Sequence, residues 1–204
     1  MIKTISVGIM ATNCYVVYDD ELKKALIVDP GEESHEVLDF IKENKLKVEY
    51  IYLTHCHFDH ILGAKWLKEQ LGAQIACLDK EESNIKNEDI TMGKTLLQKA
   101  ITLIPDKVFF ENDEIQVGNL NFKVIHTPGH TSGSSCLYGD RILISGDTLF
   151  KDTYGRCDLP TGNLSEIIKS IKTKLFELPS STIVYPGHGE STTIGRENQN
   201  EDFL

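Results

Sequence analysis

Three of the chain's seven histidines lie within residues 55–60, in the motif THCHFDH. The motif directly follows EYIYL (residues 49–53), an apolar run with the length and composition of a buried strand. In an extended backbone, residues two apart face the same side, so His55 and His57 can direct both imidazoles at one point. Neutral imidazoles beside a carboxylate are ligands for zinc, iron or manganese. The chain must therefore fold so that a buried strand ends at a metal site.

Further candidate ligands occur in the second half of the chain, each after an apolar strand and within a turn that contains glycine or proline. Side chains in such turns project from the edge of a sheet. The candidates are His126 and His130 in VIHTPGHTSGS, Asp147 in ILISGDTLF, and His188 in IVYPGHGE. Asp59 and His60 fall where the chain turns toward the next helix, so they can face a second, neighbouring position. This number of ligand-type side chains is enough for two metal ions.

Both halves of the chain contain strands followed by helices, and strand-end histidines occur in both. Strands are indicated by β-branched and apolar runs at 4–9, 14–19, 24–29, 49–53, 73–78, 107–111, 114–118, 121–127, 134–139, 141–146 and 181–186. The pattern predicts an α/β fold, a four-layer αββα sandwich of two mixed β-sheets. The length suits one domain, which we expect to span residues 1–204.

Helices are predicted from apolar periodicity and end signals. Ser34 is a candidate N-cap for residues 34–44, and Gly72 ends a helix that begins near residue 63. Residues 79–106 are charged and weakly patterned, which predicts an excursion of short helices. A helix from Asn163, with Glu166 three residues on, is expected to be capped there. Its predicted buried stripe consists of Leu164, Ile167, Ile168, Ile171 and Leu175.

Composition limits the partners and the compartment. The net charge of −10 argues against a nucleic-acid backbone as the main partner, which would require basic side chains. No stretch approaches the roughly 18 apolar residues of a membrane span. The five cysteines are odd in number, widely spread and form no CxxC pair, so no disulfide framework is indicated. The N-terminus lacks the features of a signal peptide. We therefore expect a cytoplasmic protein without a nucleic-acid or membrane partner.

The motifs HCHFDH, HTPGHTSGS, GDTLF and PGHG, in this order and spacing, resemble those of the metallo-β-lactamase-fold hydrolases. The resemblance extends from TNCYVV near the start of the chain to TTIG near its end. It is greatest to the single-domain, glyoxalase II-like (hydroxyacylglutathione hydrolase-like) group, in which GDTLF is followed by a GR-D-P stretch, here YGRCDLPTGN.

The resemblance implies two metal positions. His55, His57 and His130 would bind the first ion, Asp59, His60 and His188 would bind the second, and Asp147 would bridge them. His126 matches a position that the family does not use as a ligand. Two divalent ions, with zinc preferred over iron or manganese, would lie about 3.5–4 Å apart and make a shared water into hydroxide near neutral pH. Asp59 would be both a ligand and the catalytic carrier of the water's proton.

The resemblance implies that the protein is an enzyme, a small-molecule metallo-hydrolase similar to thioester hydrolases that act on S-2-hydroxyacylglutathione. The chain ends near the point where the helical, glutathione-binding domain of two-domain glyoxalase II begins, so the thiol half of the substrate stays open. The alternatives are a persulfide dioxygenase-like oxidoreductase with one iron, and a lactone or phosphodiester hydrolase. The complete second ligand set disfavours the first alternative, and the absence of an export signal disfavours a secreted β-lactamase.

Arg156 in YGRCDLP follows Asp147, the proposed bridging ligand, by nine residues. Two-domain relatives place a basic side chain in this loop to hold a carboxylate of glutathione, and a guanidinium can bind a carboxylate with two hydrogen bonds. The substrate would then be anionic. An equally weighted interpretation is that Arg156 pairs with Asp158 and shapes the loop.

Overall fold

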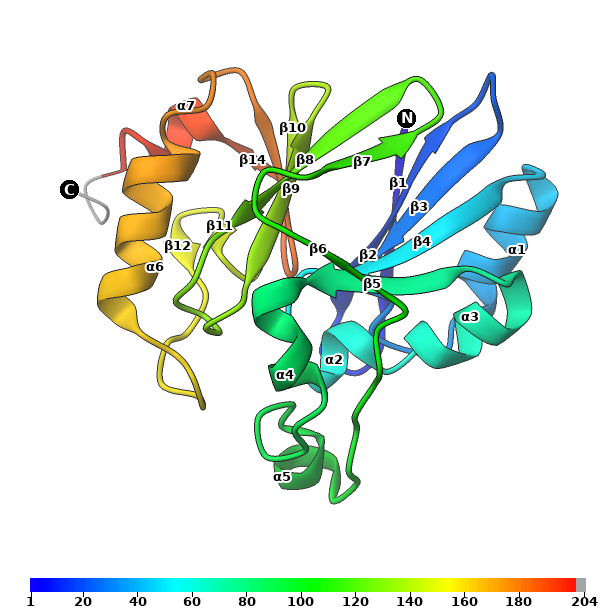
Figure 1. Ribbon diagram of the computed structural model, residues 1–204. Coiled ribbons are helices and arrows are strands. Elements are labelled where there is room, and N and C mark those ends of the chain that lie inside the picture. Colours follow the sequence, from blue (N-terminus) through cyan, green and yellow to red (C-terminus); the bar gives the residue numbers. More distant parts are fainter. Residues whose placement is uncertain (201–204) are drawn as a thin grey trace.

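The computed structural model describes residues 1–200 and contains two six-stranded sheets with helices on both outer sides (Figure 1). The first sheet comprises, in spatial order, β1 (Ile2–Val7), β2 (Thr12–Asp19), β3 (Lys24–Val28), β4 (Lys47–Leu53), β5 (Gln74–Leu78) and β6 (Lys107–Phe109). The second comprises β14 (Thr192–Thr193), β13 (Ile183–Pro186), β10 (Ile142–Gly146), β9 (Ser135–Gly139), β8 (Leu120–His126) and β7 (Glu114–Val117). A two-stranded ribbon of β11 (Leu149–Phe150) and β12 (Thr153–Tyr154) lies outside these sheets.

Both sheets are mixed. In the first sheet, the neighbouring strands from β1 to β3 pair antiparallel, and the neighbouring strands from β3 to β6 pair parallel. In the second, β10 and β13 are parallel while the remaining pairs are antiparallel. The predicted αββα sandwich of two mixed sheets is confirmed.

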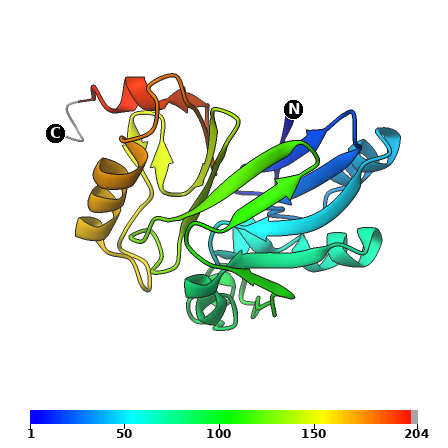
Figure 2. The same ribbon diagram turned by 45° about the horizontal axis from the view of Figure 1, so that its top comes forward.

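Three apolar clusters fill the spaces between the four layers. The middle cluster joins the two sheets and includes Tyr52, Phe122 and Ile144. The outer clusters lie between the first sheet and its helices and between the second sheet and α6. Side-chain alternation along β2 produces this division, because Tyr15 belongs to the middle cluster and Val16 to the outer one. Figure 2 shows the layers from a second direction.

Crossover helices cover the first sheet because parallel strands cannot be joined by a tight turn. They are α1 (His35–Glu43), α2 (Phe58–Ile61) and α3 (Ala64–Leu71). The Ser34 side chain accepts a hydrogen bond from Val37 N–H at 3.3 Å, which confirms the predicted N-cap. Gly72 ends α3 in the left-handed conformation, with φ 67°.

The charged excursion forms three short helices, as predicted: η1 (Asp79–Glu81), α4 (Glu82–Ile85) and α5 (Gly93–Leu97). Ile85, Met92 and Ile101 of this segment join the apolar cluster outside the first sheet. Phe58 N–H donates to Thr91 O at 2.8 Å, which holds the excursion against α2. The segment is therefore packed against the body of the protein at the end where the histidine motif lies (Figure 1).

The helix after Asn163 differs from the prediction at its first turn. It forms α6 (Leu164–Ser170), continues as the π-helical segment η2 (Ile171–Leu175), and is followed later by α7 (Ile194–Glu197). Asn163 caps it through Glu166 N–H, but its own N–H donates to Gly129 O at 2.7 Å. The helix thus begins against a loop, and Leu164 is 54% exposed rather than part of the buried stripe.

None of the helices within residues 1–200 is long and apolar enough to cross a membrane. The extent of the domain, 1–204, stays a prediction, because residues 201–204 lie outside the part that the structure describes.

Candidate metal centre

The predicted ligands meet at one edge of the sandwich because the strands before them end there. β10 and β13 are parallel, and β8 points in the same direction because both β8 and β10 are antiparallel to β9. The end of β4 in the first sheet is fixed to this edge by the hydrogen bond from Ser135 N–H to Thr54 O, 3.0 Å long. The loops after these four strands therefore converge.

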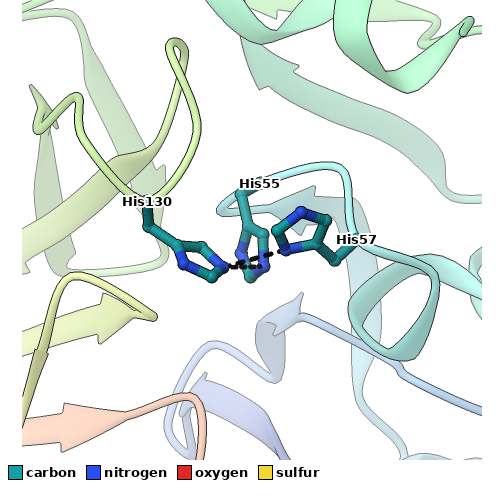
Figure 3. Close-up of side chains that lie close together, drawn as sticks. All are labelled: His55, His57 and His130. Carbon is teal, nitrogen blue, oxygen red and sulfur yellow. Dashed lines mark hydrogen bonds between the residues drawn. The ribbon is translucent and has the colours of Figure 1, made fainter. Parts of the chain in front are cut away.

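The first ligand set consists of three buried imidazoles that face one point (Figure 3). His130 Nε2 lies 2.9 Å from His57 Nδ1 and 3.2 Å from His55 Nε2. Burial lowers the pKa of all three, that of His57 to about 3 and that of His55 well below its usual value. The imidazoles are thus neutral at pH 7, and their converging nitrogen lone pairs suit a cation.

The second set lies beside the first and is richer in charge. His188 Nε2 lies 3.2 Å from His60 Nε2 and 3.3 Å from Asp59 Oδ2. Burial alone would lower the pKa of His60, but the carboxylates of Asp147, Asp59 and Asp29 outweigh it and raise this pKa to about 10. Burial would raise the pKa of Asp59, yet the neighbouring His60 and His188 lower it overall. The surrounding carboxylates thus favour a positive charge at this position, which a bound metal ion would supply.

Asp147 lies between the two sets. Its Oδ2 is 3.5 Å from His130 Nε2, and its Oδ1 is 3.4 Å from His60 Nε2. The buried Oδ1 has no hydrogen-bond partner within residues 1–200. The turn that carries His188 approaches it so closely that a Cβ on Gly187 would lie 2.1 Å from this oxygen. Asp147 thus lies where a carboxylate that binds two ions at once would be expected.

The outer nitrogens of four histidines are hydrogen-bonded, which leaves the inner nitrogens for an ion. Such partners fix the ring orientation and tautomer of metal-binding histidines. The four contacts are His55 Nδ1 to Thr54 Oγ1 (3.1 Å), His60 Nδ1 to Asp29 Oδ2 (3.0 Å), His130 Nδ1 to Arg156 O (2.8 Å) and His188 Nδ1 to Met10 O (3.2 Å). The residues present therefore fit a pair of divalent ions.

Asp29, at the end of β3, belongs to the site but was not predicted from the sequence. Its buried carboxylate accepts hydrogen bonds from Thr54 N–H (2.8 Å), from the Thr54 hydroxyl (2.6 Å) and from His60. Asp29 thus orients the His60 ring through Nδ1, the nitrogen that faces away from the other ligands. It does not form a third metal position. The signal was available, because Asp29 follows an apolar strand and adjoins a Pro-Gly pair, as His188 does.

His126 and Arg156 lie at the margins of the site. His126 Nε2 is 3.0 Å from Ser132 O, and His126 belongs to neither ligand set. The guanidinium of Arg156 makes two 2.7 Å hydrogen bonds to the carboxylate of Asp158, and both side chains are largely exposed. The structure thus shows the pairing that the alternative interpretation of Arg156 expected.

A cavity of about 330 Å³ opens over the metal centre. Five of its lining residues are proposed ligands, and the others are Arg156 and six apolar residues: Met10, Phe58, Met92, Leu96, Phe150 and Leu159. Met92 and Leu96 come from the charged excursion, so this segment forms part of the cavity wall. Such a cavity admits a small molecule with apolar groups beside the reacting bond.

The sequence model of the family described as the metallo-beta-lactamase superfamily matches residues 7–188. The chain belongs to the metallo-β-lactamase superfamily. It is also 34% identical to the hydroxyacylglutathione hydrolase GloC of Haemophilus influenzae, over 100% of this chain and 97% of that protein. The resemblance to the glyoxalase II-like group of the superfamily is thereby confirmed, and the fold implies divalent metal ions.

Solved structures of the superfamily share the fold. The BLEG-1 B3 metallo-beta-lactamase is 34% identical with a TM-score of 0.93, and each chain is covered completely. TTHA1623, solved in a di-iron-bound form, is 30% identical over 99% of this chain and 100% of its own, with a TM-score of 0.86. ETHE1 from Myxococcus xanthus is 27% identical over 98% of this chain and 82% of its own, with a TM-score of 0.80. The identity of the metal thus stays open within the superfamily.

Proposed function

We propose that this metallo-hydrolase cleaves a thioester such as S-2-hydroxyacylglutathione with the help of two divalent ions. The observation that carries the proposal is the pair of ligand sets joined by Asp147 on the floor of one cavity. His55, His57 and His130 would hold the first ion, Asp59, His60 and His188 the second, and Asp147 both. Zinc is the preferred ion on the chemistry of the ligands, with iron or manganese as alternatives.

The ions would supply a hydroxide and polarise the thioester carbonyl. The protein's own residues hold and orient this chemistry. Asp59 lines the cavity and would take up the proton of the attacking water there. The apolar side chains of Phe150 and Leu159 would exclude bulk water from the reacting bond.

The thioester is supported by the likeness to GloC, whose name states hydrolysis of a hydroxyacylglutathione. A panel of substrates tests it: the metal-loaded protein is given glutathione thioesters, small neutral thioesters, lactones and phosphodiesters at equal concentration. We expect the highest kcat/KM for a thioester. A lactone or phosphodiester that is cleaved faster would replace the thioester in this proposal.

Two of the similar solved structures suggest other reactions, which are tested together with these substrates. The likeness to ETHE1 favours the oxidoreductase alternative, a persulfide dioxygenase-like reaction with one iron. One iron per chain, with oxygen consumed when a persulfide is added, would establish that reaction. The likeness to BLEG-1 favours β-lactam hydrolysis, which a chromogenic cephalosporin reports directly.

We further propose that the substrate is a small anionic molecule, that Arg156 binds its carboxylate, and that the protein works in the cytoplasm without nucleic-acid or membrane partners. Arg156 lines the cavity, and its exposed pairing with Asp158 contributes little, so a substrate carboxylate can replace Asp158. The acidic net charge argues against a nucleic-acid partner, and the cysteine pattern supports a cytoplasmic location. The expectation of no membrane partner is supported by the sequence, in which no stretch approaches the roughly 18 apolar residues of a membrane span.

Arg156→Met is expected to lower kcat/KM for a glutathione thioester by about 5- to 100-fold, because a charge-assisted hydrogen bond to the substrate is lost. A small neutral thioester should be cleaved at the wild-type rate, and the metal content should not change. Steady-state kinetics with both substrates measure this.

Asp158→Asn is the matched control, because it frees the guanidinium that Arg156→Met removes. If Arg156 binds substrate, Asp158→Asn keeps or raises kcat/KM for the glutathione thioester. Equal losses in both variants, on both substrates, would instead show that the ion pair shapes the loop.

A further inference from the structure

Two buried side chains outside the ligand sets connect the chain segments that carry the ligands. We propose that Glu81 positions the first ligand set and Asn13 the second, so that each side chain controls the metal affinity of one site. This inference rests on the two metal positions of the proposed function.

Glu81 joins the two segments that supply the first set. Its Oε1 accepts a hydrogen bond from Cys56 N–H at 2.8 Å and one from the Thr131 hydroxyl at 2.8 Å. Cys56 lies between His55 and His57, and Thr131 follows His130. One carboxylate oxygen thus fixes the distance between the β4 loop and the β8 loop.

The surroundings of Glu81 suit a fixed carboxylate. The side chain is fully buried, and Asn84 Nδ2 donates to its Oε2 at 2.6 Å. A Cβ on Gly133 would lie 2.4 Å from this Oε2, so the β8 loop approaches it closely only because residue 133 is glycine. A carboxylate with three donors around it and no solvent contact keeps one geometry.

Asn13 holds the turn that carries His188. Its N–H donates to Gly187 O at 2.7 Å, and its side-chain Nδ2 lies 3.0 Å from both Pro186 O and Gly189 O. Three carbonyl groups around His188 are therefore bound by one residue of the first sheet. This matters because His188, unlike the histidines of the first set, is 27% exposed and lies in a turn.

Tyr15 adds a second hydrogen bond from the first sheet to the carbonyl oxygen of Pro186, which Asn13 also binds. The hydroxyl of Tyr15, two residues further along β2, donates to Pro186 O at 2.5 Å. His188 Nδ1 itself contacts Met10 O, just before this strand. The start of β2 and the turn before it thus fix the position of His188, whereas Glu81 makes no hydrogen bond to the second set within residues 1–200.

The test compares metal binding by four variants with the wild type. Metal-free protein is titrated with Co²⁺ in a calorimeter, and bound ions per chain are counted by elemental analysis. The spectra of cobalt-loaded His188→Ala and His130→Ala identify the two sites.

We expect Glu81→Ala to raise the dissociation constant of the first site about 10- to 100-fold, which is the effect typical of residues that orient ligands. Asn13→Asp should raise the dissociation constant of the second site by a similar factor. In each variant the other site should keep its affinity.

Glu81→Gln and Asn44→Asp are the matched controls. Glu81→Gln retains an oxygen that can accept from Cys56 and Thr131, so the first site should recover most of its affinity. Asn44 donates from Nδ2 to Phe40 O at 2.8 Å at the end of α1, so Asn44→Asp makes the same chemical change as Asn13→Asp outside the site. Both sites should then bind as in the wild type.

The inference is overturned if Glu81→Ala and Asn13→Asp weaken both sites equally, or if neither changes a dissociation constant. It is also overturned if Asn44→Asp weakens the second site as much as Asn13→Asp does. A wild-type protein that binds no cobalt would contradict the proposed function itself. Thermal melting of the metal-free variants separates these results from unfolding.

Discussion

Dialysis against a chelator is expected to abolish hydrolysis, with a loss of at least about a thousandfold in kcat/KM, because the hydroxide and the carbonyl polarisation both depend on the ions. The metal-free protein should also melt at a lower temperature. Ions that bind only the folded state stabilise it, by about 2.7 kcal/mol per site at a free concentration one hundred times the dissociation constant. Activity assays and melting curves measure the two effects, and elemental analysis checks that the ions have been removed.

Adding zinc back should restore activity as the content rises to two ions per chain, since two ligand sets converge in the structure. Iron and manganese are tested in parallel, and the metal that gives the highest kcat/KM identifies the preferred cofactor. Full activity in the chelated protein would contradict the metal-dependent mechanism. A protein saturated by one ion would leave the second set without its proposed role.

Asp147→Ala is expected to lower kcat/KM at least a hundredfold and to weaken the binding of both ions. Residues that merely orient ligands change affinity or activity by about 10- to 100-fold, and a shared ligand should matter more. Asp147 also lies 3.4–4.0 Å from the inner nitrogens of His55, His60, His130 and His188, so its loss removes negative charge from both sets. Kinetics and a chelator competition titration measure the two effects.

His126→Ala is the matched control for Asp147→Ala, because His126 follows the same strand-end pattern yet lies outside both ligand sets. It should keep both ions, and its free energy of unfolding should stay within about 1 kcal/mol of the wild type. If the two variants lost metal to the same extent, the assignment of ligands among the strand-end residues would be wrong.

Much of the fold and the candidate site was predictable because the signals are local. The apolar runs, the Ser34 cap and the Gly72 stop depend on neighbouring residues, and the structure contains each of them. Histidines and aspartates after apolar strands predicted a shared sheet edge, because strands that run in the same direction end together. The seven proposed ligands do meet at that edge.

The sequence alone thus determined the αββα architecture and the residues that gather at its edge, since both follow from periodicity and motif spacing. Tertiary structure decided which side chains support them. Glu81 lies in a weakly patterned segment and Asn13 in a strand. Apart from Asn84, the hydrogen-bond partners of these two side chains are 25 to 176 residues away in the chain. Leu164, the first residue of α6, is exposed although the helical pattern predicted it to be buried. Periodicity reports which face of an element is apolar, whereas the partner of a polar group depends on how distant segments pack, and only the folded chain fixes that.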